Sequence, residues 1–170
     1  IAKYTREIME ARARLRNKVF DNSLGRLNAN RTYIEKLKVP LLARRAREML
    51  KQGYWVPIFV NHKFAVEELK KDLETDYKVA TIYGSQSTQE VDEAVRAFNS
   101  GECRVIICTI SKGGQSISLH DTSEGGIRPR FSLISIPTSA TQLVQALGRC
   151  YRTNVTSSCI TEIPICKGDV

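Results

Sequence analysis

The four residues Val105-Ile106-Ile107-Cys108 lie at the centre of an apolar run, residues 103–110, from which the class of fold can be inferred. Consecutive apolar residues, without the alternation of a strand that has one solvated face, are typical of a parallel strand covered on both faces. We therefore predict a buried parallel strand over residues 103–110, with helices packed on both faces of its sheet.

Strands and helices are predicted to alternate on both sides of this run. Further strands are expected at residues 55–60, 78–83, 131–136 and 159–166, and helices at residues 64–73, 88–100 and 140–152. Ser87 and Glu90 have the spacing of a capping box, Gly101 is placed to cap the same helix, and Pro57 requires an early or an edge position in its strand. The alternation predicts an α/β fold with a doubly wound, mainly parallel sheet, whose ligand sites lie at the carboxyl ends of the strands.

Residues 1–52 are predicted to form a basic helical extension of the α/β domain, which takes residues 53–170. A first helix is expected to about Leu27, followed by a polar break at residues 28–30, a second helical stretch, and a third helix that begins at Pro40. Of the 26 Lys and Arg and the 18 Asp and Glu of the chain, 14 and 5 lie in residues 1–52, so this part carries +9 and the remainder −1. The extension either packs against the domain with solvated charges or contacts nucleic acid directly.

The five cysteines are expected to be buried thiols of a reducing compartment, with zinc ligands or disulfides as the alternative, because their number is odd and no C-x-x-C pair is present. The composition, 42% hydrophobic over 170 residues, supports a core without disulfides or a metal site. No apolar run has the length of about 20 residues that a membrane span needs, and no signal peptide is visible. An intracellular protein, in nucleus or cytoplasm or of viral origin, is expected, and the first residue, Ile1, suggests a piece of a longer chain.

The segment from Gln142 to Arg152 carries the strongest candidate for chemistry. On a continuous helix, Gln145, Gly148, Arg149 and Arg152 would share one face. Arginine suits the binding of a polyphosphate because its planar guanidinium donates to two phosphate oxygens at once and stays charged. The alternative is a surface helix with two solvated arginines.

This Q-x-x-G-R-x-x-R pattern resembles motif VI of the superfamily 2 helicases, and other segments resemble further motifs of that family in the same order. Ile58-Phe59-Val60-Asn61 is similar to motif IV, Ile82-Tyr83-Gly84-Ser85 to the next conserved block, and residues 105–121 to motif V. The resemblance covers residues 53–166 and implies the second RecA-like domain of such a helicase. Ala43-Arg44-Arg45-Ala46 and the Gly-rich insertion at residues 121–130 add a narrower similarity to strawberry-notch-like helicases, including relatives in large DNA viruses.

The resemblance also implies the roles of single residues. Arg152 would be the arginine finger that stabilises charge on the γ-phosphate of ATP, Arg149 would assist it, and Gln145 would orient phosphate or water. Gly148 and Asp121 would complete the ATP contacts, although the family's ribose-binding aspartate cannot be assigned with certainty to Asp121. The expected nucleic-acid contacts are Asn61, His62, Gly84, Ser85, Thr109, Ser111 and Lys112.

Two motifs of a complete ATPase are missing from the chain. It contains neither G-x-x-x-x-G-K-[ST] nor D-E-x-[DH], so the ligands of Mg²⁺ and part of the ATP site are expected on a first RecA-like domain of the same protein. The expected partners are that domain and DNA or RNA, with no membrane, and the fragment alone should not hydrolyse ATP. The alternatives are a nucleic-acid-binding or scaffolding module without ATPase activity, and a small-molecule α/β transferase, for which no motif is present.

Overall fold

Five parallel strands form the central sheet of this computed structural model, which describes residues 23–113, 117–121, 127–152 and 155–165. The strand order is β2-β3-β1-β4-β5, and every neighbouring pair is parallel. The strands are β1 (Val56–Val60), β2 (Val79–Ile82), β3 (Val105–Thr109), β4 (Arg130–Ile134) and β5 (Cys159–Glu162). All five residues of β1, β3 and β4 are buried, as the apolar runs predict for strands covered on both faces.

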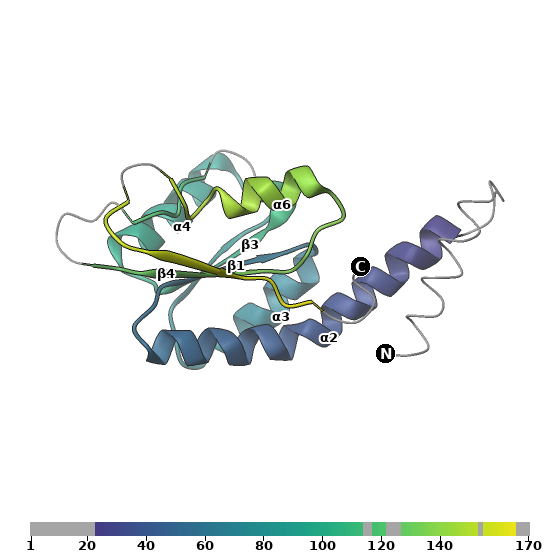
Figure 1. Cartoon of the computed structure of the whole chain (residues 1–170), viewed down its shortest axis with the longest axis horizontal. Helices are drawn as coiled ribbons and strands as arrows, with labels where there is room; N and C mark the ends of the chain where they lie inside the picture. The colour runs from purple at the N-terminus through teal and green to yellow at the C-terminus, as the bar shows by residue number, and fades with distance from the viewer. Residues whose placement is uncertain (1–22, 114–116, 122–126, 153–154, 166–170) are drawn as a thin grey trace.

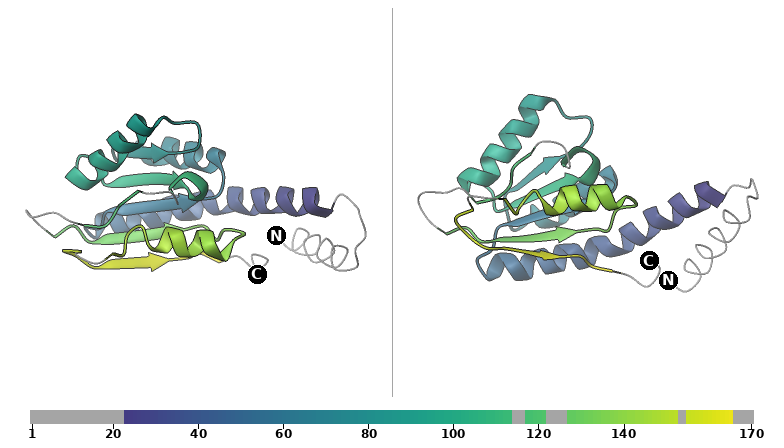
Figure 2. Two further views of the ribbon diagram at one scale, coloured as in Figure 1. Left: turned by 90° about the horizontal axis from the view of Figure 1, so that it is seen from above. Right: turned by 45° about the horizontal axis from the view of Figure 1, so that its top comes forward.

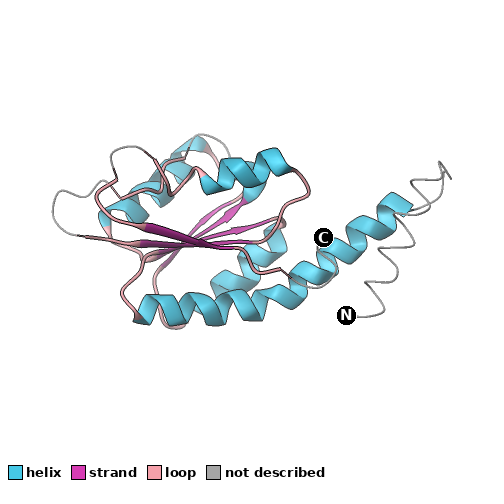
Figure 3. Ribbon diagram, viewed as in Figure 1, coloured by secondary structure: helices cyan, strands magenta, loops and turns pink. Residues whose placement is uncertain are grey.

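Helices cover both faces of the sheet, which confirms the doubly wound α/β fold (Figures 1 and 3). One face packs against α2 (Ser23–Lys51) and α3 (Lys63–Leu73), and the other against α4 (Thr88–Ser100) and α6 (Ala140–Leu147). A short helix, α5 (Ile110–Gly113), follows β3 directly. Each face has its own hydrophobic core, because inward side chains of one strand alternate between the two layers, as Ile58 and Phe59 of β1 do.

The predicted ends of α4 are confirmed by their hydrogen bonds. The backbone N–H of Glu90 donates to Oγ of Ser87 at 3.3 Å, and the backbone N–H of Ser87 donates to Oε2 of Glu90 at 2.7 Å, which is a complete capping box. Gly101 ends the helix with φ +87°, a left-handed conformation that glycine adopts without steric cost.

The predicted division of the N-terminal part into several helices is wrong, because residues 23–51 form one helix that contains Pro40. Proline inside a helix removes one hydrogen bond and costs about 3 kcal/mol. Here Pro40 faces solvent, while Val39, Leu42 and Ala46 are buried against the sheet, and this burial offsets the cost. Figure 1 shows a bend in α2 between the half that lies under the sheet and the half that extends beyond it. Residues 1–22 of the first predicted helix lie outside the described residues, whereas its predicted end near Leu27 and the predicted break at residues 28–30 fall inside α2.

Ion pairs attach the C-terminal half of α2 to the rest of the domain. Arg45 contacts Glu162 of β5 at 2.9 Å, and Arg47 contacts Asp72 and Asp76, in and after α3, each at 2.9 Å. These contacts, with the apolar contacts of the same helix, place residues 39–50 in the packed body (Figure 2). Some of the basic residues within residues 1–52 therefore form ion pairs with acidic residues of the α/β domain. The domain boundary between residues 52 and 53 stays a prediction.

Candidate functional site

The carboxyl edge of the sheet collects the residues predicted to contact nucleic acid. Strands β2, β3 and β1 are parallel neighbours, so the segments that follow them meet at one edge. Gly84, Ser85 and Ser111 are exposed there, and Asn61, His62 and Lys112 are partly exposed. Thr109, the last residue of β3, is 4% exposed, and its hydroxyl has no hydrogen-bond partner among the described residues. The fold thus brings together residues that are up to 51 positions apart, between Asn61 and Lys112.

A buried glutamate of α2, which the motif analysis missed, holds the loop after β1. Oε1 of Glu35, a residue 2% exposed, accepts hydrogen bonds from the backbone N–H of Asn61 at 2.6 Å and from its Nδ2 at 3.1 Å. Nδ2 of Asn61 also donates to the carbonyl oxygen of Ile136, after β4, at 3.2 Å. The Asn61 side chain therefore joins α2 to the ends of two strands. Asn61 thus helps to fix the position of the loop at this edge, and its side-chain amide is already hydrogen-bonded to other residues of the chain.

His62 lies beside the same carboxylate. Its Nε2 is 3.6 Å from Oε2 of Glu35 and 3.5 Å from the hydroxyl of Thr32, and its ring stacks on Phe64 with centroids 5.5 Å apart. The side chain is 40% exposed, so one side of the ring remains accessible to a ligand. Glu35 lies on the same helix face as Leu42 and Ala46, which are both fully buried. This helical spacing was the signal in the sequence that could have predicted a buried carboxylate.

The second group of predicted residues lies at and beyond the end of α6, and here the predicted helix is too long. The helix ends at Leu147 and not near Arg152, so only Gln145 of the four motif residues is on it. Gly148 is its C-cap, Arg149 and Cys150 form a turn, and Arg152 lies in irregular chain. The prediction that Gln145, Gly148, Arg149 and Arg152 share one face of a helix is therefore wrong, because the last three residues lie beyond the helix.

A tertiary contact replaces the next helical turn. The carbonyl oxygen of Arg149 accepts a hydrogen bond from the backbone N–H of Leu119 at 3.0 Å. In a longer helix, the same oxygen would accept a hydrogen bond from the next helical turn. Nη1 of Arg149 donates in return to the carbonyl oxygen of Ile117 at 3.2 Å. The motif V segment, residues 117–121, is thus bonded directly to the motif VI segment.

Positive charge is concentrated where these two segments meet. Burial and the charge of Arg152 lower the pKa of Arg149, which shows that the two guanidinium groups influence one another. Burial lowers the pKa of His120, with further lowering by Arg152 and Arg130, against the opposite effect of Asp121. Arg152 is exposed, and among the described residues no carboxylate forms an ion pair with it. An anion that approached Arg149 and Arg152 would relieve their repulsion.

Asp121 and Gln145 have different surroundings. Asp121 is 1% exposed, its Oδ2 accepts from the backbone N–H of Arg128 at 2.9 Å, and its carbonyl oxygen accepts from Thr156 at 3.0 Å. These bonds give Asp121 a role in holding the chain on both sides of the insertion. Gln145 is exposed and has no such restraint.

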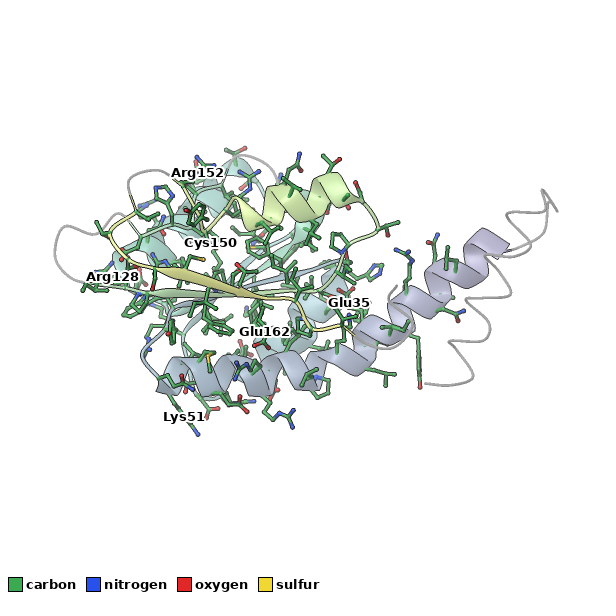
Figure 4. The ribbon with its side chains drawn as sticks, viewed as in Figure 1. Glu35, Lys51, Arg128, Cys150, Arg152 and Glu162 are labelled. Atoms are coloured by element: carbon green, nitrogen blue, oxygen red, sulfur yellow. The ribbon has the colours of Figure 1, made fainter. Side chains whose placement is uncertain are left out.

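The buried carboxylate of Glu35 and the motif VI arginine Arg152 lie on opposite faces of the sheet, whereas α5 packs on the same face as α6. Figure 4 shows Glu35, the partner of Asn61, on the side of α2, and Arg152 on the side of α6. Within the described ranges, no cluster of three or more His, Cys, Asp or Glu side chains could hold a metal ion. No helix in the described part of the chain has the length and apolar character to cross a membrane.

Comparison with known proteins identifies relatives of this chain. The family description "Helicase conserved C-terminal domain" matches residues 41–154. A protein of Acanthamoeba polyphaga mimivirus that carries the name of an ATP-dependent RNA helicase is 32% identical over 163 residues, which are 96% of this chain and 28% of the relative. The chain thus spans little more than a quarter of this viral relative, whose source agrees with the similarity to large-DNA-virus helicases.

Solved structures have the same fold. The RNA helicase Prp28 of Chaetomium thermophilum, bound to ADP, is 20% identical with a TM-score of 0.56, over 71% of this chain and 30% of that one. Dbp5 of S. cerevisiae, bound to RNA and ADP BeF3, is 20% identical with a TM-score of 0.56, over 79% of this chain and 34% of that one. At this level of identity the likeness establishes the RecA-like fold alone.

Proposed function

Because the chain belongs to the helicase conserved C-terminal domain family, we propose that it is the second RecA-like motor domain of an ATP-dependent nucleic-acid helicase or translocase. In this proposal Arg152 is the arginine finger, and Arg149 binds a phosphate beside it. The observation that carries the proposal is an exposed arginine, without a carboxylate partner in the described residues, next to a second arginine anchored by the motif V segment.

ATP would bind between this domain and a first RecA-like domain elsewhere in the protein. The residues present fit the phosphate end of a nucleotide, since Gln145, Gly148 and Arg152 are exposed and Arg149 is partly exposed. Among the described residues no cluster of side chains could hold Mg²⁺, so the proposal assigns the carboxylate that binds Mg²⁺ and the lysine that binds phosphate to the other domain. ATP bound with Mg²⁺ would supply the hydrolysable γ-phosphate, and the arginines of this chain would stabilise the charge that develops on it.

Nucleic acid would bind at the carboxyl edge of the sheet. Gly84, Ser85 and Ser111 offer small exposed groups near a phosphodiester backbone, and Lys112 offers a charge. RNA is the first substrate to test, because it appears in the name of the viral relative and in the Dbp5 complex. Such a substrate, together with the thiols of Cys103, Cys108, Cys150 and Cys159, supports the proposal that the protein acts inside a cell.

The bond between Leu119 and Arg149 suggests how the two sites are coupled. α5 lies at the proposed nucleic-acid edge and packs against α6, and residues 117–121, a few positions further along the chain, bond to Arg149. A shift of α5 on binding nucleic acid would therefore be passed to Arg149 through one backbone hydrogen bond and one guanidinium hydrogen bond. This coupling predicts that nucleic acid stimulates hydrolysis.

The full-length protein with and without Arg152→Ala tests the proposal. We expect ATP hydrolysis in the presence of RNA or DNA to fall by about 10³-fold or more, with nucleic-acid binding within about twofold of the unchanged protein. Arg96→Ala, which removes an exposed arginine of α4, is the matched control and should leave hydrolysis unchanged. Hydrolysis by Arg152→Ala at the normal rate would exclude the arginine finger. Absence of hydrolysis in the unchanged full-length protein would favour the alternative, a binding or scaffolding module of helicase fold.

A further inference from the structure

A buried polar cluster with two thiols lies between β4, β5 and the chain after α6, and the proposed function makes no use of its chemistry. Cys150 and Arg130 are each 1% exposed, and Arg130 and Cys159, the first residues of β4 and β5, are register partners in the sheet. Figure 4 shows Cys150 between the sheet and the chain that follows α6. Cys159 packs against the core cluster that contains Cys150, and the two thiols influence one another's ionisation.

Arg130 supplies a positive charge to this cluster. Its Nε donates to the carbonyl oxygen of Leu119 at 3.0 Å, and its guanidinium lies 4.6 Å from the ring centroid of Phe98. Its Nη1 is buried and has no hydrogen-bond partner among the described residues. A buried donor of this kind stabilises a negative charge nearby, and the field of Arg130 reaches both thiols.

A pocket gives small molecules access to one of the two thiols. It has a volume of about 360 Å³ and is lined by Leu147, Gly148, Tyr151, Cys159 and Thr161. Tyr151 is 73% exposed and Gly148 is exposed, so the pocket opens to solvent. Cys159 faces this space, whereas Cys150 lies behind it in the core.

We propose that Cys159 is a site of reversible oxidation by hydroperoxides and that Cys150 is its resolving thiol. The Cys159 thiolate attacks one oxygen of the hydroperoxide, an S–O bond forms as the O–O bond breaks, and the other oxygen leaves as water or an alcohol after taking up a proton. The sulfur of Cys150 then attacks the sulfenic sulfur, the S–S bond forms as the S–O bond breaks, and water leaves with the Cys150 proton. Two molecules of a low-molecular-weight thiol then break the S–S bond, join to form their own disulfide, and restore both cysteines as thiols.

The order of the two residues follows from their surroundings. Cys159 lines the pocket, and its interaction with Cys150 lowers its pKa against the opposite effect of burial, with smaller lowering by Thr161 and Arg130. The interaction with Cys159 and burial raise the pKa of Cys150. Burial raises the pKa of Cys103 to about 11 and that of Cys108 further, so these thiols are poor nucleophiles. Selectivity for Cys159 is therefore built into the core.

The location gives the modification a consequence for the candidate site. Cys150 lies one residue after Arg149 and two before Arg152. A disulfide to Cys159 would fix this segment to β5, a strand that it otherwise meets through side-chain contacts. The chemistry itself does not depend on the proposed function.

The 170-residue chain, fully reduced and then treated with hydrogen peroxide at equimolar amount, tests the proposal by intact mass and peptide mapping. We expect the mass to fall by two hydrogen atoms, a peptide linking Cys150 to Cys159, and full reversal by dithiothreitol. Cys159→Ser should abolish the reaction, whereas Cys150→Ala should stop it at a sulfenic acid on Cys159 that dimedone traps. Cys103→Ser is the matched control and should react normally.

Three results would overturn the proposal: a link from Cys159 to Cys166 or to a second molecule, irreversible oxidation of Cys159 without a link, or no reaction while free cysteine is oxidised. Mapping of the unaltered chain decides the matter even where a variant fails to fold. Iodoacetamide labelling at neutral pH adds an independent readout, since Cys159 should react about tenfold faster than Cys103.

Discussion

The carboxylate of Glu35 accepts two hydrogen bonds from one residue, Asn61, at 2.6 Å from the backbone nitrogen and 3.1 Å from the side-chain nitrogen. The pair joins a helix outside the recognised motifs to the loop that follows the central strand. Both residues lie at the carboxyl edge of the sheet, where we propose that nucleic acid binds. The geometry of the edge thus depends on α2 as well as on the strands.

Glu35→Ala should destabilise the domain, because it leaves the backbone N–H of Asn61 without its acceptor and removes one of the acceptors of its Nδ2. We expect a loss of about 2–3 kcal/mol in the free energy of unfolding, measured by urea denaturation. Asn61→Ala should lose less in the Glu35→Ala background than in the unchanged chain, which a double-mutant cycle measures as coupling. Glu68→Ala, at an exposed position of α3, is the control and should change stability by less than about 0.5 kcal/mol. Full additivity of the Glu35 and Asn61 effects would contradict the contact.

Ser87→Ala should remove the side-chain bonds of the capping box of α4, at a cost of about 1 kcal/mol, and keep the bond from the backbone N–H of residue 87 to Glu90. Thr88→Ala, one residue further on, is the control. The effect should depend on pH. Hydrogen bonds from the backbone and the side chain of Ser87 lower the pKa of Glu90 in the folded state, so their contribution is present above the ordinary carboxyl pKa of 4.5 and is lost as pH falls through the lowered folded value. Thermal unfolding between pH 7 and pH 3 should show the difference between the variant and the unchanged chain shrinking in acid. A difference that grows in acid would exclude this assignment.

Sequence periodicity predicted the strands well and the helix ends less well, for identifiable reasons. The residues around Ile106 are buried on both faces of the strand, so their continuous apolar sequence is enough to predict a buried strand. The end of α6 depends instead on the hydrogen bond from Leu119 to Arg149, a contact across 30 positions that no local pattern contains. In the same way, the pairing of Glu35 with Asn61 requires knowledge of how α2 crosses the sheet.

Pro40→Ala tests why α2 is continuous. If packing of Val39 and Leu42 overcomes an unfavourable proline, alanine should restore a hydrogen bond to the carbonyl oxygen of Lys36 and raise the free energy of unfolding by about 1–3 kcal/mol. Leu41→Ala, the neighbouring exposed position, should change stability little. A loss of stability in Pro40→Ala would mean that the bend of α2 is itself required for packing. Chemical denaturation monitored by circular dichroism gives both values.

Lys112→Ala should weaken nucleic-acid binding by the full-length protein through the loss of one phosphate contact. Binding measured over a series of salt concentrations should give a log–log slope smaller by about 0.7 for a single strand or about 0.9 for a duplex. Lys71→Ala, an equally charged change at the end of α3, is the control, because α3 runs back from the carboxyl edge and Lys71 is exposed near its far end. An unchanged slope in Lys112→Ala would remove α5 from the interface. If deletion of residues 1–22, which carry six Lys or Arg and three Asp or Glu, then flattened the slope, the contact would belong to the N-terminal part.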